Sequence, residues 1–133
     1  MRLILASSSK TREMLLHRIC GNSFEILPPE IDETPLSSED PKDLSERLSL
    51  EKALKISELN RDAVVIGSDQ VAFCDGKILK KSNNLEDAFE QISWQIGKQT
   101  TFFTGLALAR HGGKEVQSGT ITSRVFYRDS DFI

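Results

Sequence analysis

A continuous run of β-branched and small apolar residues, AVVIGSD at residues 63–69, fits into few folds. Such a run is typical of a strand buried inside a sheet, and we expect this strand to end at Gly67. A second apolar run, residues 2–6, stops at three consecutive serines and predicts another buried strand. Two such strands with helical patterns between them indicate an α/β protein.

Helical periodicity and turn residues complete the pattern. Residues 10–20 predict a helix capped by Ser9, and residues 42–59 predict the longest helix, capped by Ser38 or Asp40. The other predicted elements are a strand at 24–27, an acidic loop at 30–41, a hairpin at 71–79 that turns at Asp75-Gly76, a helix at 85–96 capped by Asn84, a strand at 100–110 broken by Gly105, a turn at 111–114 and a strand at 115–128. This order mixes crossovers with hairpins, so we expect an α/β fold, a twisted mixed β-sheet flanked by helices.

The bulk composition excludes several classes of protein. With 133 residues the chain is expected to form one domain, and its formal net charge of −3 gives no general attraction to nucleic acid or anionic membranes. Cys20 and Cys74 provide neither a metal-binding spacing nor a disulfide framework, and we expect both thiols to be buried. No apolar stretch is long enough to cross a bilayer and the serines cut short any signal sequence, so we expect a cytoplasmic protein.

The turn between the first strand and the first helix is a candidate anion site. Backbone N–H groups at a helix N-terminus favour anions, serine hydroxyls add donors, and Arg12 can place two donors on one phosphate. The alternative is that Ser9 only caps the helix and that Arg12 is a solvated surface residue. No glycine-rich loop followed by Lys-Ser or Lys-Thr is present, so this turn is not a P-loop.

Acidic residues provide candidates for metal binding and proton transfer. Asp69 follows the strongly apolar strand, at the kind of position where α/β proteins bind ligands, and it could hold a divalent cation or accept a proton from water. Asp32 and Glu33, in the acidic loop, could complete such a metal site. The alternatives are that Asp69 only bonds the backbone of its own turn and that the loop is merely solvated.

Two lysines, Lys52 and Lys81, are candidate phosphate ligands, although a solvated surface position is the ordinary alternative for each. Neither histidine is placed to activate a serine or cysteine nucleophile, and the sequence contains no zinc-ligand cluster. Trp94 and the pair Phe102-Phe103 are expected in the core.

Six motifs occur in an order and spacing that resemble the Maf-like nucleoside triphosphate pyrophosphatases: LILASSSKTREMLL, IDET, RLSLEKA, VIGSDQV, DGKILKK and TGLAL. The resemblance extends from residue 2 to about residue 131. The form S-D-Q-V at residues 68–71 resembles the branch that hydrolyses 7-methyl-GTP, whereas the dTTP/UTP branch tends to have A-D-T-V there. The resemblance implies an inosine-triphosphatase-like architecture, with a cleft between two lobes.

The resemblance also implies an activity. Such enzymes cut a nucleoside triphosphate between the α and β phosphates, here 7-methyl-GTP as the favoured substrate, and thereby remove non-canonical nucleotides. They use a divalent metal cation, Mg²⁺ or Mn²⁺, and the implied partner is the nucleotide, without nucleic acid or membrane. By position in the motifs, the implied catalytic residue is Asp69, the substrate-binding residues are Ser9, Arg12, Glu33, Lys52 and Lys81, the specificity residues are Thr11 and Gln70, and the metal ligands are Asp69 and Glu33.

Two features depart from the family pattern. Lys80 and Ser82 stand where the family usually has glycine and proline around the matched Lys81, so we expect a looser turn. Family members continue beyond Ile133, which lies within an apparent helix start, so we expect one shortened domain at 1–133 with an incomplete second lobe. Exposed apolar sheet then predicts a homodimer. The alternative function is a weak or inactive nucleotide-binding remnant with a regulatory role, for example in cell division.

Overall fold

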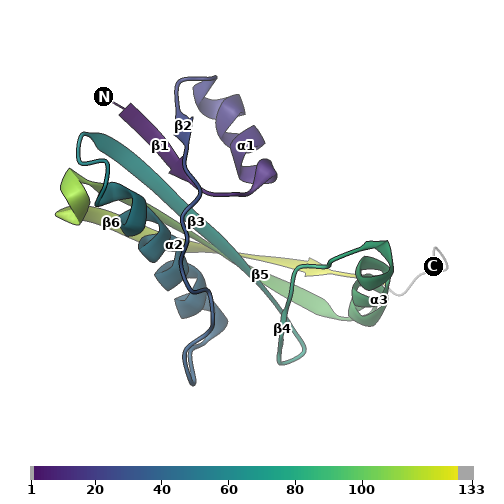
Figure 1. Cartoon of the computed structure of the whole chain (residues 1–133). Helices are drawn as coiled ribbons and strands as arrows, with labels where there is room; N and C mark the ends of the chain where they lie inside the picture. Colours follow the sequence, from purple (N-terminus) through teal and green to yellow (C-terminus); the bar gives the residue numbers. More distant parts are fainter. Residues whose placement is uncertain (1, 129–133) are drawn as a thin grey trace.

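The computed structural model describes residues 2–128, and this part of the chain forms one six-stranded sheet (Figure 1). The strand order is β2-β1-β3-β5-β6, and β4 pairs with β3 beside this path. The elements are β1 (Arg2–Ala6), α1 (Lys10–Cys20), β2 (Glu25–Ile26), α2 (Pro41–Ser57), β3 (Ala63–Cys74), β4 (Lys77–Leu79), α3 (Leu85–Gln95), β5 (Gln99–Arg110), the 3-10 turn η1 (His111–Gly113) and β6 (Glu115–Phe126). The helix start expected near Ile133 lies outside the described residues.

The sheet is mixed, and its two kinds of pairing follow from the two kinds of connection. β1 is parallel to β2 and to β3, because α1 and α2 form crossovers between these strands. The pairs β3–β4, β3–β5 and β5–β6 are antiparallel. In Figure 1, α1 lies at the top beside β1 and β2, and α3 lies near the right-hand end of the long strands. The predicted α/β class, a mixed sheet flanked by helices, is confirmed.

The central strand is longer than predicted. We expected it to end at Gly67, but β3 continues to Cys74 because β5 pairs with it as far as that residue. β1 accompanies β3 only as far as Gly67, which lies opposite Ala6. Asp69 therefore lies within β3, two residues beyond the point where the parallel partner ends. This is the carboxyl end of β1, the edge at which α/β sheets usually bind ligands.

Helix α2 packs unusually close to the sheet. The α2 residues Ser45, Ser49 and Ala53 are fully buried, and they face glycines in the sheet. A Cβ atom built at Gly67 would overlap the carbonyl oxygen of Ser49, and one at Gly105 would overlap that of Ser45. Gly105 was expected to break its strand, but β5 runs without interruption through it. The glycine is needed because α2 leaves no room for a side chain.

This packing predicts that Gly105→Ala lowers the free energy of unfolding by about 1–3 kcal/mol, the usual cost of overfilling a packed core. Urea denaturation followed by circular dichroism measures the change. The matched control is Gly119→Ala in β6, because a Cβ atom there meets nothing within 4 Å. Equal stability of the two variants would show that α2 does not approach β5 this closely.

Apolar side chains remain exposed at both ends of the described chain. On the edge strand β6, Ile121 is 68% exposed and Phe126 is 61% exposed. On α1, Ile19 is 79% exposed. The homodimer expected from the sequence stays a prediction. Cys74 is buried as expected, whereas Cys20 is only partly buried.

Among the described helices, none combines the length and the apolar character that a membrane span requires.

Candidate active site

One hollow of about 680 Å³ brings the predicted site residues together from distant parts of the chain. The predicted residues that line it are Ser9, Thr11, Arg12, Glu33, Lys52, Asp69, Gln70 and Lys81. They come from the start of α1, the acidic loop, α2, β3 and the segment after β4. Every candidate that the family resemblance implied therefore borders a single space, while their chemical roles stay predictions.

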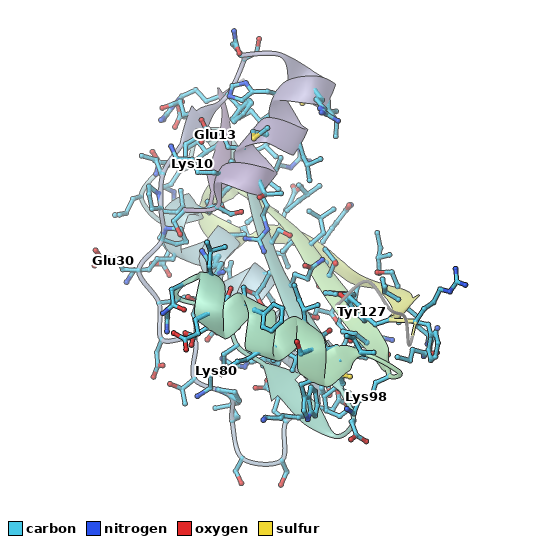
Figure 2. The ribbon with its side chains drawn as sticks, turned by 90° about the vertical axis from the view of Figure 1, so that its right-hand side faces the viewer. Lys10, Glu13, Glu30, Lys80, Lys98 and Tyr127 are labelled. Atoms are coloured by element: carbon cyan, nitrogen blue, oxygen red, sulfur yellow. The ribbon has the colours of Figure 1, made fainter. Side chains whose placement is uncertain are left out.

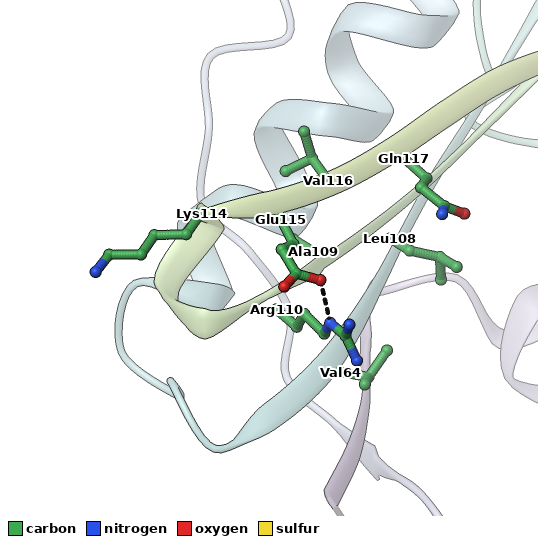
Figure 3. Close-up of a pocket in the computed structure, with 8 residues that line it drawn as sticks. All are labelled: Val64, Leu108, Ala109, Arg110, Lys114, Glu115, Val116 and Gln117. Atoms are coloured by element: carbon green, nitrogen blue, oxygen red, sulfur yellow. Dashed lines mark hydrogen bonds and ion pairs between the residues drawn. The ribbon is translucent and has the colours of Figure 1, made fainter.

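A second hollow, of about 590 Å³, lies beside the turn between β5 and β6 (Figure 3). Its charged residues include Arg110 and Glu115, and Arg110 Nε donates to Glu115 Oε2 at 2.6 Å. The charge of the arginine is thus neutralised by its neighbour. None of the predicted site residues lines this hollow, so the first hollow is the candidate active site.

The turn before α1 is shaped by its serines. Ser9 Oγ accepts a hydrogen bond from the backbone N–H of Arg12 at 3.3 Å, which confirms Ser9 as the cap of α1. Ser7 Oγ accepts from the N–H of Ser9 at 3.0 Å and fixes the approach to the helix. Capping does not exclude ligand binding, because Ser9 also lines the hollow and its hydroxyl can still donate. Arg12 is partly buried beside it rather than a fully solvated residue.

Lys52 joins the two carboxylates that were predicted to act together. Its Nζ lies 3.0 Å from Oδ1 of Asp69 and 3.1 Å from Oε1 of Glu33. The side chains of Lys52 and Asp69 are 11% and 12% exposed, whereas that of Glu33 is 58% exposed. An ammonium group has three N–H donors, so two contacts leave Lys52, which lines the hollow, one donor for a further anion.

Burial and the neighbouring positive charges shift the pKa of Asp69 in opposite directions. Burial raises the pKa of Asp69 above its ordinary value, since removal from water disfavours the charged carboxylate. The positive charges of Lys52 and Arg12 lower the pKa and offset part of that rise, while Glu33 raises it. A carboxylate with a raised pKa accepts a proton more readily than an ordinary aspartate, which suits a general base.

Arg47 of α2 bonds the acidic loop to the helix. Arg47 donates to Glu39 Oε2 at 2.6 Å, to Glu51 Oε2 at 2.7 Å and to the carbonyl oxygen of Thr34 at 3.2 Å. These bonds hold the residue next to Glu33 and so place Glu33 near Lys52. Asp32, the other candidate in this loop, accepts from the N–H of Thr34 at 2.9 Å and does not line the hollow.

The specificity candidates line the hollow, together with residues that the sequence did not indicate. Gln70 Nε2 donates to Thr104 Oγ1 at 3.0 Å across β3 and β5. Phe102 was expected in the core, but it is only partly buried and lines the hollow, as does Tyr127. Phe102 lies two residues from Thr104 on one strand, so both side chains face the same side of the sheet as Gln70. The alternation of side chains along a strand would have predicted that Phe102 lies on this face.

The residues present fit a divalent cation of the kind predicted. Within residues 2–128 no three His, Cys, Asp or Glu side chains converge as a ready-made metal cage. Asp69 and Glu33 nevertheless meet at Lys52, which contacts one oxygen of each, Oδ1 and Oε1. Mg²⁺ is usually bound by one or two carboxylates together with substrate phosphates. Two carboxylates beside a hollow bordered by Arg12 and lysines match that arrangement.

Two solved structures share this fold. A protein described as a nucleoside-triphosphatase, dITP/XTP pyrophosphatase, from Mycobacterium abscessus has a TM-score of 0.52 at 15% identity, over 94% of this chain and 74% of that chain. A HAM1 protein from Coxiella burnetii has a TM-score of 0.60 at 11% identity, over 93% of this chain and 71% of that chain. At such low identity the likeness shows the fold alone.

Curated relatives are much more similar in sequence. A 7-methyl-GTP pyrophosphatase from Idiomarina loihiensis is 47% identical over 80% of this chain and 54% of its own length. A 7-methyl-GTP pyrophosphatase from Vibrio parahaemolyticus is 42% identical over 96% of this chain and 65% of its own length. The chain thus spans between about half and two thirds of the length of these relatives. The family model described as Maf-like protein matches residues 2–131, and since this covers nearly the whole chain, the chain belongs to the Maf-like family.

Proposed function

We propose that this chain hydrolyses a nucleoside triphosphate, in the first place 7-methyl-GTP, to the nucleoside monophosphate and pyrophosphate with the help of a divalent metal. The observation that carries the proposal is the gathering of Arg12, Lys52, Lys81 and Asp69 around one hollow. The relatives named 7-methyl-GTP pyrophosphatase in Idiomarina loihiensis and Vibrio parahaemolyticus support the substrate.

The cationic side of the hollow is suited to a triphosphate. Several negative charges enter a small space, and fixed positive groups must offset their mutual repulsion. Arg12 can hold a phosphate with two parallel donors, and the start of α1 adds the positive end of a helix dipole together with the Ser9 hydroxyl. The ammonium groups of Lys81 and Lys52 add positive charge beside the phosphates, and Lys52 has one N–H donor left for them. An overall acidic chain can bind a triphosphate because these groups are concentrated locally.

The carboxylate side is suited to activating water. Asp69 accepts a proton from a water molecule while the oxygen of that water attacks the α-phosphorus. The bond between the α-phosphorus and the oxygen that bridges to the β-phosphorus then breaks. The electron pair of that bond leaves with pyrophosphate, and the nucleoside monophosphate remains. Lys52 orients Asp69, and its positive charge offsets part of the rise that burial causes in the pKa of Asp69.

Asp69 and Glu33 are the residues that would hold the metal, through oxygens that Lys52 does not contact. When bound, Mg²⁺ or Mn²⁺ supplies neutralisation of the charge that develops on the phosphates. The side chains expected to select the base are Gln70, which Thr104 orients, and Thr11, which lies on the first turn of α1 next to Arg12.

A pyrophosphate-release assay over canonical and modified nucleoside triphosphates tests this proposal. We expect release from 7-methyl-GTP with Mg²⁺ or Mn²⁺, less from GTP, and none after chelation of the metal with EDTA. GTP is the matched control because it differs from 7-methyl-GTP only in the methyl group and the charge of the base. No release from any nucleotide, by a sample with the expected circular dichroism spectrum, contradicts the proposal for this chain.

Nucleotide binding without turnover is the second candidate function. The observation that favours it is the position of Lys52 Nζ within 3.1 Å of both carboxylates, where it competes with a cation for them. Titration calorimetry with 7-methyl-GTP distinguishes the two candidates, because heat of binding without pyrophosphate release supports the second.

A further inference from the structure

Lys81 lies in an irregular segment, residues 80–84, between β4 and α3. No regular backbone ladder fixes this segment, yet a phosphate-binding lysine needs a defined position. The sequence predicted a looser turn here because Lys80 and Ser82 replace glycine and proline. The non-glycine residues with positive φ in the described chain are Ser38, Asp75 and His111, so Lys80 adopts a backbone conformation that needs no glycine.

A side chain of α3 restrains this segment in place of regular backbone hydrogen bonds. Gln91 Nε2 donates a hydrogen bond to the carbonyl oxygen of Lys80 at 2.7 Å. That carbonyl belongs to the peptide group that joins Lys80 to Lys81, so the bond restrains the backbone directly before Lys81. Figure 2 shows Lys80 beside α3. Both Gln91 and Lys81 line the hollow.

Gln91 is itself held by a polar chain that begins in the sheet. Thr100 of β5 is fully buried, and its hydroxyl donates to Gln95 Oε1 at 2.6 Å. Gln95 is 4% exposed, and its Nε2 donates to the backbone carbonyl of Gln91 at 3.2 Å. At the other end, Asn84 caps α3 by accepting from the N–H of Asp87 at 2.8 Å. A buried pair thus anchors α3 to β5 and sets the place from which Gln91 reaches Lys80.

We propose that Gln91 is a positioning residue, which acts through the Lys80 carbonyl to hold Lys81 toward the phosphates of the bound nucleotide. The phosphate ligand rests on the proposed function, whereas the restraint on the Lys80–Lys81 backbone does not. Gln91 needs no contact with the nucleotide for this role. Its amide is required as a donor, and a side chain of equal length without that donor cannot replace it.

The test uses Gln91→Met, which keeps the length of the side chain and removes the donor. The matched control is Gln117→Met on β6, an exposed glutamine outside the hollow. We expect the NMR order parameters of the Lys81 and Ser82 amides to fall from about 0.85, typical of a rigid backbone, toward about 0.6 in Gln91→Met only. Calorimetry is expected to show about five-fold weaker binding of 7-methyl-GTP, the effect of losing one ordinary hydrogen bond.

A double-mutant cycle separates positioning from general damage. In a Lys81→Met background, Gln91→Met is expected to cause no further loss of affinity, because the lysine that it positions is already absent. Unchanged order parameters in Gln91→Met, or an equal further loss of affinity in the Lys81→Met background, overturn the inference. If the unchanged chain binds no nucleotide, the proposed function fails, and the order parameters alone then decide whether Gln91 restrains this backbone.

Discussion

The Asp69→Asn variant is expected to release pyrophosphate from 7-methyl-GTP about 10²- to 10⁴-fold more slowly than the unchanged chain, the usual effect of removing a general base. Asparagine has nearly the shape of aspartate but cannot accept the proton of the attacking water at neutral pH. It also removes one of the two carboxylates near Lys52. Initial rates of pyrophosphate release at saturating Mg²⁺ measure the loss.

The matched control is Asp32→Asn, which makes the same chemical change one residue before Glu33. Asp32 does not line the hollow, and an asparagine oxygen can still accept from the N–H of Thr34. We therefore expect its rate to stay within about two-fold of the unchanged chain, as surface substitutions away from a site usually behave. A fully active Asp69→Asn protein would remove Asp69 from the reaction, whatever its effect on stability.

The Lys52→Met variant is expected to lose about 3–5 kcal/mol of unfolding free energy near pH 8, in buffer that contains EDTA. Methionine fills much of the same space but leaves Asp69, whose side chain is only 12% exposed, as a charge that has lost its nearest cation. Glu33 contributes less to the loss, because its side chain is 58% exposed and keeps contact with water. Urea denaturation at several pH values measures the change.

The pH dependence of this loss has a defined sign. Burial already raises the pKa of Asp69, and removal of Lys52 takes away the largest influence that lowers it. The folded variant therefore binds a proton more readily than the unfolded chain, in which an ordinary aspartate has a pKa near about 3.9. Stability must then fall as pH rises through the raised pKa, so the deficit of Lys52→Met shrinks as the pH is lowered through that pKa.

The double variant Lys52→Met/Asp69→Leu provides the control for this explanation. Replacing both members of a buried ion pair by apolar groups is often neutral, whereas removing one partner is costly. We expect the double variant to recover most of the loss near neutral pH and to show no such pH dependence. A Lys52→Met protein with unchanged stability, or a deficit that is independent of pH, would show that Lys52 does not hold a buried charge at Asp69.

Much of the local structure could be predicted because each piece is encoded by adjacent residues. α1 spans the predicted residues 10–20 with Ser9 as its cap, and the hairpin turns at Asp75-Gly76. These features depend on the caps and turns that short-range hydrogen bonds favour. The length of β3 could not be predicted in this way, because residues beyond Gly67 remain a strand only where β5 lies alongside.

The candidate site likewise has a part that the sequence predicted and a part that it did not. The chemical types at Arg12, Lys52 and Asp69, and their match to a family pattern, were visible in the linear chain. Their relation in space was not, because Lys52 reaches Asp69 only when α2 lies directly on the glycines of β3 and β5. The register between strands and the approach of a helix depend on contacts between distant segments, and no local pattern records such contacts. The sequence therefore determined which chemical groups are available, whereas long-range packing brought these groups together into one site.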